Sequence, residues 1–217
     1  MRWVEIRALL RGWKYMLRKY FMVSSFPNVH SKARLGMYNS VVNPDNIILD
    51  ETAKLKRDNV IMNGRAKFIM KKWSGAAEQL MIITGNHMFV PGVKGMDVSD
   101  KMKDELDTEH EFDKDVIVDE DVWIGARVTI LAGVHVARGC SIGSGTVLRK
   151  STPPYSIVIG NPAKVVGFRF TPEEIIEHEK KLYPEEERLP LSLLEKNYEK
   201  YFLNRIKEIK QFTSLKL

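Results

Sequence analysis

Few side chains in this chain of 217 residues can act as an acid, a base or a nucleophile near neutral pH; it has one cysteine and five histidines. Histidine suits the removal of a proton from a hydroxyl group, because its ordinary pKa lies near neutrality. His87 stands apart from the others: it ends an apolar strand, follows the turn pair Gly85-Asn86 and precedes a long insertion at about 88–115. From its position alone, His87 is either a general base or a structural histidine at a strand end.

A six-residue repeat is the strongest pattern in the sequence. Six consecutive hexads begin at Val118: VDEDVW, IGARVT, ILAGVH, VARGCS, IGSGTV and LRKSTP. The first position always holds a branched aliphatic residue, the fifth a small or β-branched one, and the second is glycine at 125 and 143. This period fits neither a helix face nor a single strand, but it fits short strands joined by tight corners that glycine tolerates. Three sides make one triangular coil, so residues 118–153 supply two coils. The alternative, a β-sandwich, requires that the spacing be coincidental.

A weaker run of hexads precedes this one. LDETAK, LKRDNV and IMNGRA begin at Leu49, and Arg65 breaks the pattern. The segments FIM at 68–70 and LMII at 80–83 still have the composition of short buried strands. Cys140 takes an inward position in the later run, so we expect a core cysteine rather than a nucleophile.

The other histidines lack a comparable motif. His30 lies in a loop rich in Ser, Pro and Asn; His135 takes the sixth position of a hexad, where we expect a solvated corner; and His178 lies in a charged helical stretch and should be exposed. His110 lies within the insertion, either as a second acid or base or as a solvated loop residue.

The hexads, VWIG at 122–125, GNH at 85–87 and the closing IVIGNPAKVVG at 157–167 together resemble the hexapeptide-repeat acyltransferases. The resemblance covers about residues 40–168 and is to the maltose and galactoside O-acetyltransferases, the xenobiotic acetyltransferases and the sugar O-acetyltransferases of polysaccharide clusters. It implies a mainly β fold, a left-handed parallel β-helix with N-terminal and C-terminal α-helical appendages, which is an exception to the right-handed crossover rule. It also implies a homotrimer with active sites between subunits.

The same resemblance makes His87 the general base of an acyl transfer from acetyl-CoA to a hydroxyl group. It implies that the insertion protrudes and helps to wall the site of a neighbouring subunit. An acid in the insertion, such as Asp107 or Glu109, is a candidate to orient His87 across that interface. No metal is required.

The resemblance also implies a path for coenzyme A. The pantetheine arm should pass Ala126 and Ser144, each of which follows a hexad glycine. Its phosphates, which favour Lys and Arg, should meet cations near the end of the repeats: Arg149, Lys150 and Lys164. The alternative for these cations is an ordinary solvated rim.

One position departs from the family pattern. Some relatives carry another basic residue shortly after the lysine of the closing motif, but this chain has Gly167, and Arg169 is the candidate substitute.

Two residues are candidates for acceptor binding. An exposed tryptophan on a solenoid is typical of a ligand contact or an interface, which points to Trp123. Asn63 matches a family asparagine that binds the acceptor sugar.

The leading interpretation is an acetyl-CoA-dependent acetyltransferase acting on a hydroxyl of a sugar or glycan precursor. The alternatives are N-acetylation of an amino sugar or antibiotic-type acceptor, and a catalytically inactive β-helix scaffold.

The net charge of +6 lies largely in residues 1–22, where six Lys and Arg oppose one Glu. The body of the chain is therefore close to neutral, which argues against nucleic-acid binding.

Three segments follow from these patterns. Residues 1–45 should hold a lead-in and, over 1–22, an amphipathic helix that packs on protein or rests on an anionic membrane surface. Residues 46–168 should form the β-helix, and residues 169–217 the C-terminal helices. We expect one helix to begin at Thr171-Pro172 and to end at Pro184. Ser192 with Glu195 should form a capping box for a second helix that runs towards Gln211. The single cysteine and the lack of a long apolar run predict a cytoplasmic location, with possible peripheral contact at the inner membrane face.

Overall fold

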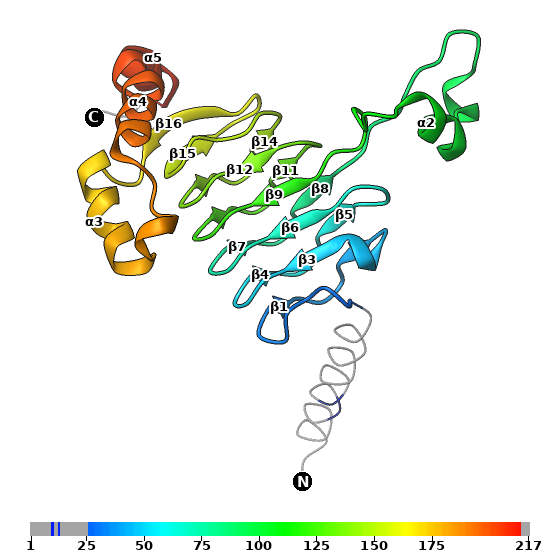
Figure 1. Ribbon diagram of the computed structural model, residues 1–217, viewed down its shortest axis with the longest axis horizontal. Coiled ribbons are helices and arrows are strands. Elements are labelled where there is room, and N and C mark those ends of the chain that lie inside the picture. Colours follow the sequence, from blue (N-terminus) through cyan, green and yellow to red (C-terminus); the bar gives the residue numbers. More distant parts are fainter. Residues whose placement is uncertain (1–9, 11–12, 14–25, 214–217) are drawn as a thin grey trace.

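The computed structural model describes residues 10, 13 and 26–213. The amphipathic helix predicted over residues 1–22 lies outside the described residues, apart from Leu10 and Trp13, whose side chains are exposed. From residue 26 onward the chain winds into stacked triangular coils, with helices at the C-terminal end and one long projection from the side (Figure 1).

The coils have three sides, each a sheet in which neighbouring strands come from successive coils. Side 1 consists of β1 (Arg34–Leu35), β4 (Lys54–Leu55), β7 (Gly75–Ala76), β10 (Trp123–Ile124), β13 (Ser141–Ile142), β15 (Ser156–Ile159) and β16 (Lys164–Phe168). Side 2 consists of β2 (Ser40–Val41), β5 (Val60–Met62), β8 (Met81–Ile83), β11 (Thr129–Ile130) and β14 (Val147–Leu148). Side 3 consists of β3 (Ile47–Leu49), β6 (Phe68–Met70), β9 (Val116–Val118) and β12 (His135–Val136).

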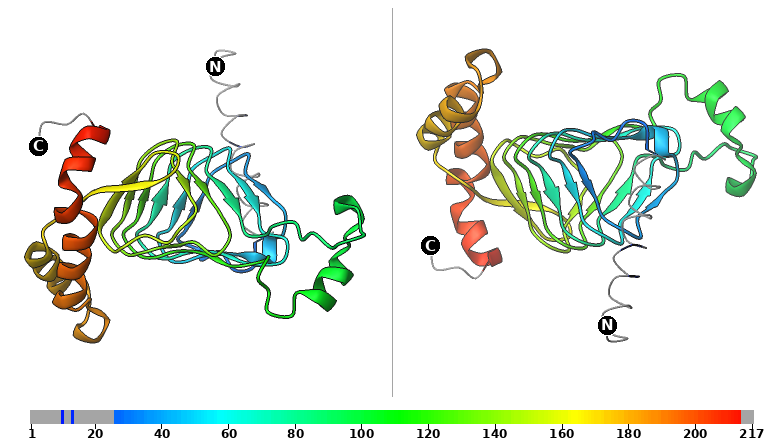
Figure 2. Two further views of the ribbon diagram at one scale, coloured as in Figure 1. Left: turned by 90° about the horizontal axis from the view of Figure 1, so that it is seen from above. Right: turned by 90° about the horizontal axis from the view of Figure 1, so that it is seen from below.

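All strand pairs within the three sides are parallel except β15 with β16, which is an antiparallel hairpin. The triangular coils predicted from the hexads and the left-handed parallel β-helix implied by the family resemblance are confirmed. It begins earlier than residue 46, because β1 and β2 already pair with the coil that follows them. Figure 2 shows the coils stacked one on another, with the C-terminal helices at one end.

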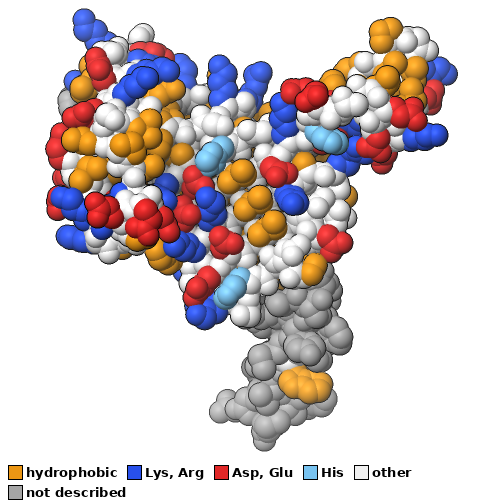
Figure 3. All heavy atoms as spheres, viewed as in Figure 1, with side chains coloured by type: hydrophobic (Ala, Val, Ile, Leu, Met, Phe, Trp, Pro, Cys, Tyr) orange, Lys and Arg blue, Asp and Glu red, His pale blue; other side chains and the backbone are white. Residues whose placement is uncertain are grey.

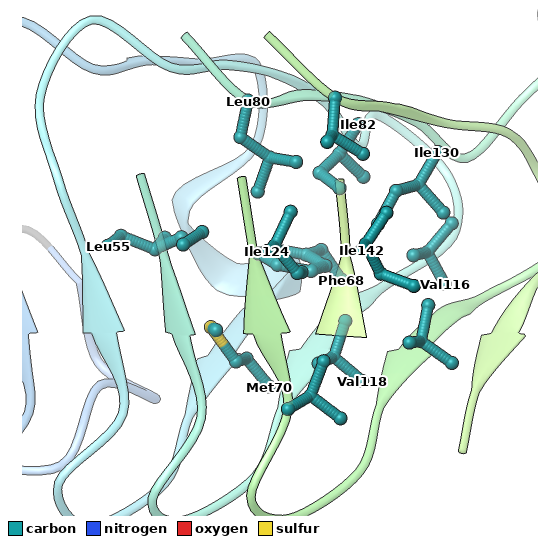
Figure 4. Packing of buried hydrophobic residues seen from close by; sticks show 14 of the residues in the cluster. Leu55, Phe68, Met70, Leu80, Ile82, Val116, Val118, Ile124, Ile130 and Ile142 are labelled. Carbon is teal, nitrogen blue, oxygen red and sulfur yellow. The ribbon is translucent and has the colours of Figure 1, made fainter. Parts of the chain in front are cut away.

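The interior is filled by the hexad positions that the sequence marked as inward. The aliphatic first positions point into the prism, as Figure 4 shows for Ile124, Ile130 and Ile142. The small fifth positions are also buried, among them Cys140, whose Sγ lies 3.1 Å from Thr152 Oγ1. Cys140 is fully buried and is therefore a core residue, as predicted, and this burial raises the pKa of its thiol.

The corners lie at the fourth position of the hexad and not at the second or sixth. Asp121 and Arg127 have a positive φ there, as have the glycines at 133, 139 and 145. Trp123 and His135, in sixth positions, were predicted at corners but belong to strands β10 and β12. The reason is strand alternation: each residue directly before an inward aliphatic side chain points outward.

The glycines at the second position are required because no side chain fits there, and not because the backbone adopts a positive φ. A Cβ atom on Gly125 would lie 2.6 Å from the backbone nitrogen of Ser144 in the next coil. A Cβ atom on Gly143 would lie 2.7 Å from Cγ2 of Ile159. Only glycine lets successive coils approach this closely at that edge.

Between β8 and β9 the chain leaves the coils as a projection, residues 86–112, which we call the arm (Figure 1). It contains η2 (Gly95–Asp97) and α2 (Asp100–Leu106), a helix capped by Ser99, whose Oγ accepts from Met102 N. A shorter turn, η1 (Pro44–Asn46), lies between β2 and β3. The insertion predicted at about 88–115 is therefore an excursion from one coil.

The C-terminal helices follow the sequence signals only in part. Helix α3 (Pro172–Leu182) begins with the predicted Thr171 cap, whose partner in a capping box is Glu174. Helix α4 (Leu191–Tyr201) follows η3 (Glu185–Glu187) and begins after Pro190 with no side-chain cap, so the capping box predicted from Ser192 is wrong. The expected single helix is also divided, into α4, η4 (Leu203–Arg205) and α5 (Ile206–Thr213).

A buried ionic contact holds α3 against the coils. The Glu179 carboxylate is fully buried; it accepts from Tyr155 Oη at 3.0 Å and lies 3.3 Å from Nη1 of Arg138. The Arg138 guanidinium also lies 3.9 Å from the centre of the Tyr183 ring. A buried carboxylate is tolerated when a cation and hydrogen-bond donors compensate its charge, as here. Among the described residues, no helix is long and apolar enough to cross a membrane.

We predict that Gly125→Ala lowers the thermal unfolding midpoint by about 3–10 °C, because overpacking costs about 1–3 kcal/mol. Differential scanning calorimetry of purified protein is the measurement. Gly64→Ala is the matched control, since the nearest atom to its new Cβ would be Val42 Cγ1 at 3.7 Å, an ordinary contact. Equal midpoints for the two variants would contradict the close-approach explanation.

Candidate active site

His87 lies where the arm leaves the coils. Strand β8 ends at Ile83, and Gly85 forms an isolated antiparallel bridge with Asp113 as the chain returns. Asn86 is fixed on both sides of its backbone: its N–H donates to the Phe112 carbonyl at 2.7 Å, and its carbonyl accepts from Lys103 Nζ at 2.8 Å. The imidazole of His87 follows this fixed residue and is exposed.

An ionic network at the base of the arm supports this turn. The Asp113 carboxylate is nearly buried and lies 2.7 Å from Lys103 Nζ and 2.8 Å from Arg65 Nε. Arg65 also binds Asp104 of α2. Arg65 is the residue that broke the early hexads, and its structural role is to clamp the arm to the coil below. Charge-assisted bonds of this kind are stronger than neutral ones.

The acids proposed to orient His87 have different surroundings. The Asp107 carboxylate accepts from Glu111 N at 2.7 Å and from Phe112 N at 3.0 Å, so it closes the returning turn of its own arm. Burial opposes the charge of Asp107, but these backbone donors outweigh it and lower its pKa. Glu109 is exposed at the same turn. His110 lines a pocket of about 450 Å³ with Arg65, Asp113 and Asp115.

A second pocket, of about 500 Å³, lies at the C-terminal end of the coils and contains the cations predicted to meet phosphate: Arg149, Lys150 and Lys164. We call it the cationic pocket. Its other lining residues include Tyr201 and Arg205, which the sequence did not indicate. They come from α4 and η4, and only tertiary docking of these helices brings them there. Arg169, the candidate substitute at the closing motif, instead binds Asp121 at 2.8 Å, on side 1.

The loop of His87 and the cationic pocket share one edge of the prism. Ile82 pairs with Ile130, and Ile130 pairs with Leu148, so the residues after β8, β11 and β14 line the edge between sides 2 and 3. Strands in a sheet lie about 4.8 Å apart, which places the root of the arm about 10 Å along the axis from Arg149 and Lys150. Figure 3 shows a hollow outline between the C-terminal helices and the arm, with Lys and Arg side chains along it.

Ala126 and Ser144 lie on a different edge, between sides 1 and 2. They are stacked in successive coils, where Gly145 N donates to the Ala126 carbonyl at 2.9 Å. Only β14 and its flanking residues separate Ser144 from Lys150, a path of at most about 20 Å along the chain. The structure therefore places the five residues predicted for cofactor binding along the last coils but not in one pocket.

The two predicted acceptor residues differ sharply in exposure. The Asn63 side chain is fully buried, with Oδ1 accepting from Asn43 N at 3.0 Å and Nδ2 donating to the Asn43 carbonyl at 2.8 Å. This amide links two coils, and its hydrogen bonds within the chain leave it no access to a sugar. Trp123 is 56% exposed on side 1, where it lines a pocket of about 340 Å³ with Trp73.

The remaining histidines are placed as follows. His30 is exposed, and its Nδ1 accepts from Lys32 N. His178 was expected at the surface but is half-buried, because its ring packs edge-on against Tyr155 at 5.9 Å. His135 is half-exposed on β12, with Nε2 2.6 Å from the Asp119 carboxylate. Among the described residues, no group of three or more His, Cys, Asp or Glu is placed to hold a metal ion.

The fold defines a class of architecture, the parallel β-helix built from six-residue repeats. Residues 115–150 match the family model described as bacterial transferase hexapeptide, six repeats. No curated protein matches the chain significantly. The resemblance predicted from the hexads is thereby confirmed for the repeat itself.

Solved structures share the fold. A maltose O-acetyltransferase from Clostridium difficile 630 is 22% identical, with a TM-score of 0.57, covering 70% of this chain and 74% of its own. A hexapeptide-repeat-containing acetyltransferase from Vibrio cholerae O1 biovar eltor, complexed with acetyl-CoA, is 17% identical with a TM-score of 0.57, covering 70% and 77%. A galactoside acetyltransferase in complex with coenzyme A is 17% identical with a TM-score of 0.57, covering 83% and 87%. At these identities the likeness establishes the architecture.

The contact between His135 and Asp119 predicts a pH dependence of stability. The hydrogen bond to Asp119 raises the pKa of His135 above its ordinary 6.5. The contribution of the pair is therefore fully present below pH 6.5 and is lost as pH rises through the folded-state pKa. Across pH 5.5–8.5, the thermal midpoint of His135→Gln should fall less than that of the wild-type protein. A parallel fall in both proteins would refute the assignment, and His30→Gln is the control for loss of an exposed imidazole.

Proposed function

We propose that this protein is an acetyltransferase that transfers the acetyl group of acetyl-CoA to a hydroxyl of a sugar or glycan precursor, with His87 as general base. The observation that carries the proposal is the position of His87 at the root of the arm, on the same prism edge as the cationic pocket. The fold shared with acetyltransferases supports it, as does the hexapeptide-repeat match.

The chemistry follows from the side chains available. Bound acetyl-CoA supplies an acetyl thioester. His87 accepts the proton of the acceptor hydroxyl as its oxygen attacks the thioester carbonyl, backbone N–H groups stabilise the oxyanion, and His87 returns the proton to the departing thiolate. The products are an acetyl ester and free coenzyme A. The exposed imidazole at a fixed turn suits this role, because Asn86 holds the backbone beside it in place.

Charge and shape support the donor. A phosphate-bearing ligand in the cationic pocket would meet Arg149, Lys150 and Lys164, the residues that the family resemblance implies. The pantetheine chain of the ligand would then follow the last coils past Ser144 and Ala126. The spread of these residues over two edges suits a long ligand rather than a compact one.

Active sites between subunits are part of the proposal. Trp123 lies on side 1, whereas His87 lies on the opposite edge of the same prism, so Trp123 would reach an acceptor only from a neighbouring copy. Two outward apolar rows are available for self-association. One, on side 2, contains Val60, Met62 and Met81; the other, on side 3, contains Ile48, Ile69 and Ile117. A cyclic ring joins two different surfaces of each copy, and the resemblance implies three copies.

We predict that His87→Ala lowers kcat by about 10²- to 10⁴-fold, the usual contribution of a general base. Release of free coenzyme A thiol, followed with a chromogenic disulfide over a panel of sugars and amino sugars, is the assay. His110→Ala, which removes the neighbouring exposed imidazole of the arm, should retain turnover within a few fold. Near-wild-type rates in His87→Ala would refute the base. Turnover of amino sugars alone would replace O-acetylation by N-acetylation, and no acetyl-CoA binding at all would favour a scaffold.

The trimer gives a separate prediction. Light scattering after gel filtration should report three times the chain mass of 25.0 kDa. Met62→Glu, which places a charge in the side 2 row, should shift the protein towards monomers, because a desolvated unpaired charge opposes burial. Lys67→Glu, a charge change at an exposed position outside both rows, is the control. A monomeric wild-type protein would exclude sites between subunits.

A further inference from the structure

The last helix of the chain lies against the cationic pocket. Lys164, in the closing motif, has its Nζ 3.3 Å from Glu208 Oε1 of α5 and 4.7 Å from the centre of the Phe212 ring. A Cβ atom on Gly160 would lie 3.2 Å from the Phe212 ring, so α5 is packed directly on the closing turn. Ile209, between the two contacts, is buried.

The same carboxylate also binds Arg205. Arg205 Nε lies 3.1 Å from Glu208 Oε2, and Nη2 lies 3.1 Å from Oε1, which is a bidentate contact. Arg205 and Lys164 thus share one carboxylate, and both line the cationic pocket. The hydrogen bond with Arg205 is the main cause of the lowered pKa of Glu208, so its charge persists at neutral pH.

We propose that Glu208 is an internal counter-ion that a ligand phosphate displaces, and that Arg205 then binds this phosphate together with Lys164. The proposal rests on the proposed function, in which the donor is coenzyme A. It assigns to η4 and α5 a role in selecting the phosphorylated end of the donor, in addition to the cations of the repeat and its closing motif, Arg149, Lys150 and Lys164.

Competition follows from the chemistry of the two anions. A phosphate monoester carries more negative charge than a carboxylate and offers three acceptor oxygens, so it binds a pair of cations better. It must nevertheless break the contacts of Glu208, and this cost lowers the net affinity. A ligand without that phosphate gains nothing from displacing Glu208. Removing the carboxylate should therefore strengthen binding of the phosphorylated ligand selectively.

Glu208→Gln tests the competition. Isothermal titration calorimetry of the full chain with coenzyme A and with 3′-dephospho-coenzyme A compares ligands that differ by one phosphate. We expect Glu208→Gln to bind coenzyme A about two- to fivefold more tightly, the range of a solvent-exposed ion pair, and to leave the affinity for dephospho-coenzyme A unchanged. Glu195→Gln is the matched control, because Glu195 is exposed on α4 and lines a different pocket, beside Thr171.

Arg205→Gln tests the assigned contact. Coenzyme A should bind about tenfold more weakly, with KM for acetyl-CoA raised and kcat unchanged, whereas dephospho-coenzyme A should bind as in the wild-type protein. Circular dichroism and light scattering establish that each variant is folded and assembled. Raising the salt concentration should shrink the difference between the two ligands.

Two results would overturn the inference: equal affinities in Glu208→Gln and Glu195→Gln, or an equal loss for both ligands in Arg205→Gln. Neither result would contradict the proposed acetyl transfer, provided that coenzyme A binds and His87→Ala is inactive. Failure of every variant and of the wild-type protein to bind either ligand would instead refute the donor, and the counter-ion with it.

Discussion

The structure depends on the stacking of like side chains between successive coils. Each side of a coil contributes an inward aliphatic residue that lies on the equivalent residue of the coil before it, as Ile124 lies on Ala76 and beneath Ile142. The parallel ladder fixes this register, because a shift of one residue would turn the inward row outward. Repeat proteins gain stability from such neighbour-to-neighbour contacts. A fixed register also makes each prism edge a regular series of positions, on which functional groups from distant parts of the sequence align.

The sequence predicted the coils well because the repeat is local and strict from Val118 onward. It misplaced the corners, since positive φ occurs at a position held by Asp121 and Arg127 as well as by glycine, and residue type alone does not reveal it. It assigned the glycines of the second position to backbone freedom. Their actual constraint is a close contact with the next coil, Gly125 with Ser144 and Gly143 with Ile159, which no local pattern contains.

Sequence motifs indicate candidate site residues, but they do not indicate the tertiary contacts that hold these residues in place. GNH located His87, and the closing motif located Lys164, but nothing near His87 in the sequence indicated that Lys103 fixes Asn86. Asn63 shows the opposite failure, since a motif position suggested ligand binding and the amide proves to be a link between coils. In the sequence, Arg65 only interrupts the hexad repeat. Its role in clamping the arm follows from its contact with Asp113, which the sequence does not indicate.

The arm and the C-terminal helices are the two departures from the repeat. Both rise beside one prism edge, the arm next to its middle strand β8 and the helices at its C-terminal end. A solenoid edge by itself offers regularly spaced side chains but no deep pocket, because its side chains point outward in parallel rows. Depth comes from elements that rise above the edge: the arm beside His87, and η4 with α5 beside Lys164. Both are fastened by charged contacts, Arg65 with Asp113 and Lys164 with Glu208. The first is nearly buried and suits a permanent hold, whereas the second is exposed and suits exchange with another anion. The burial of these two ion pairs thus separates the part of the edge that holds the proposed base from the part at which we propose that a charged ligand binds.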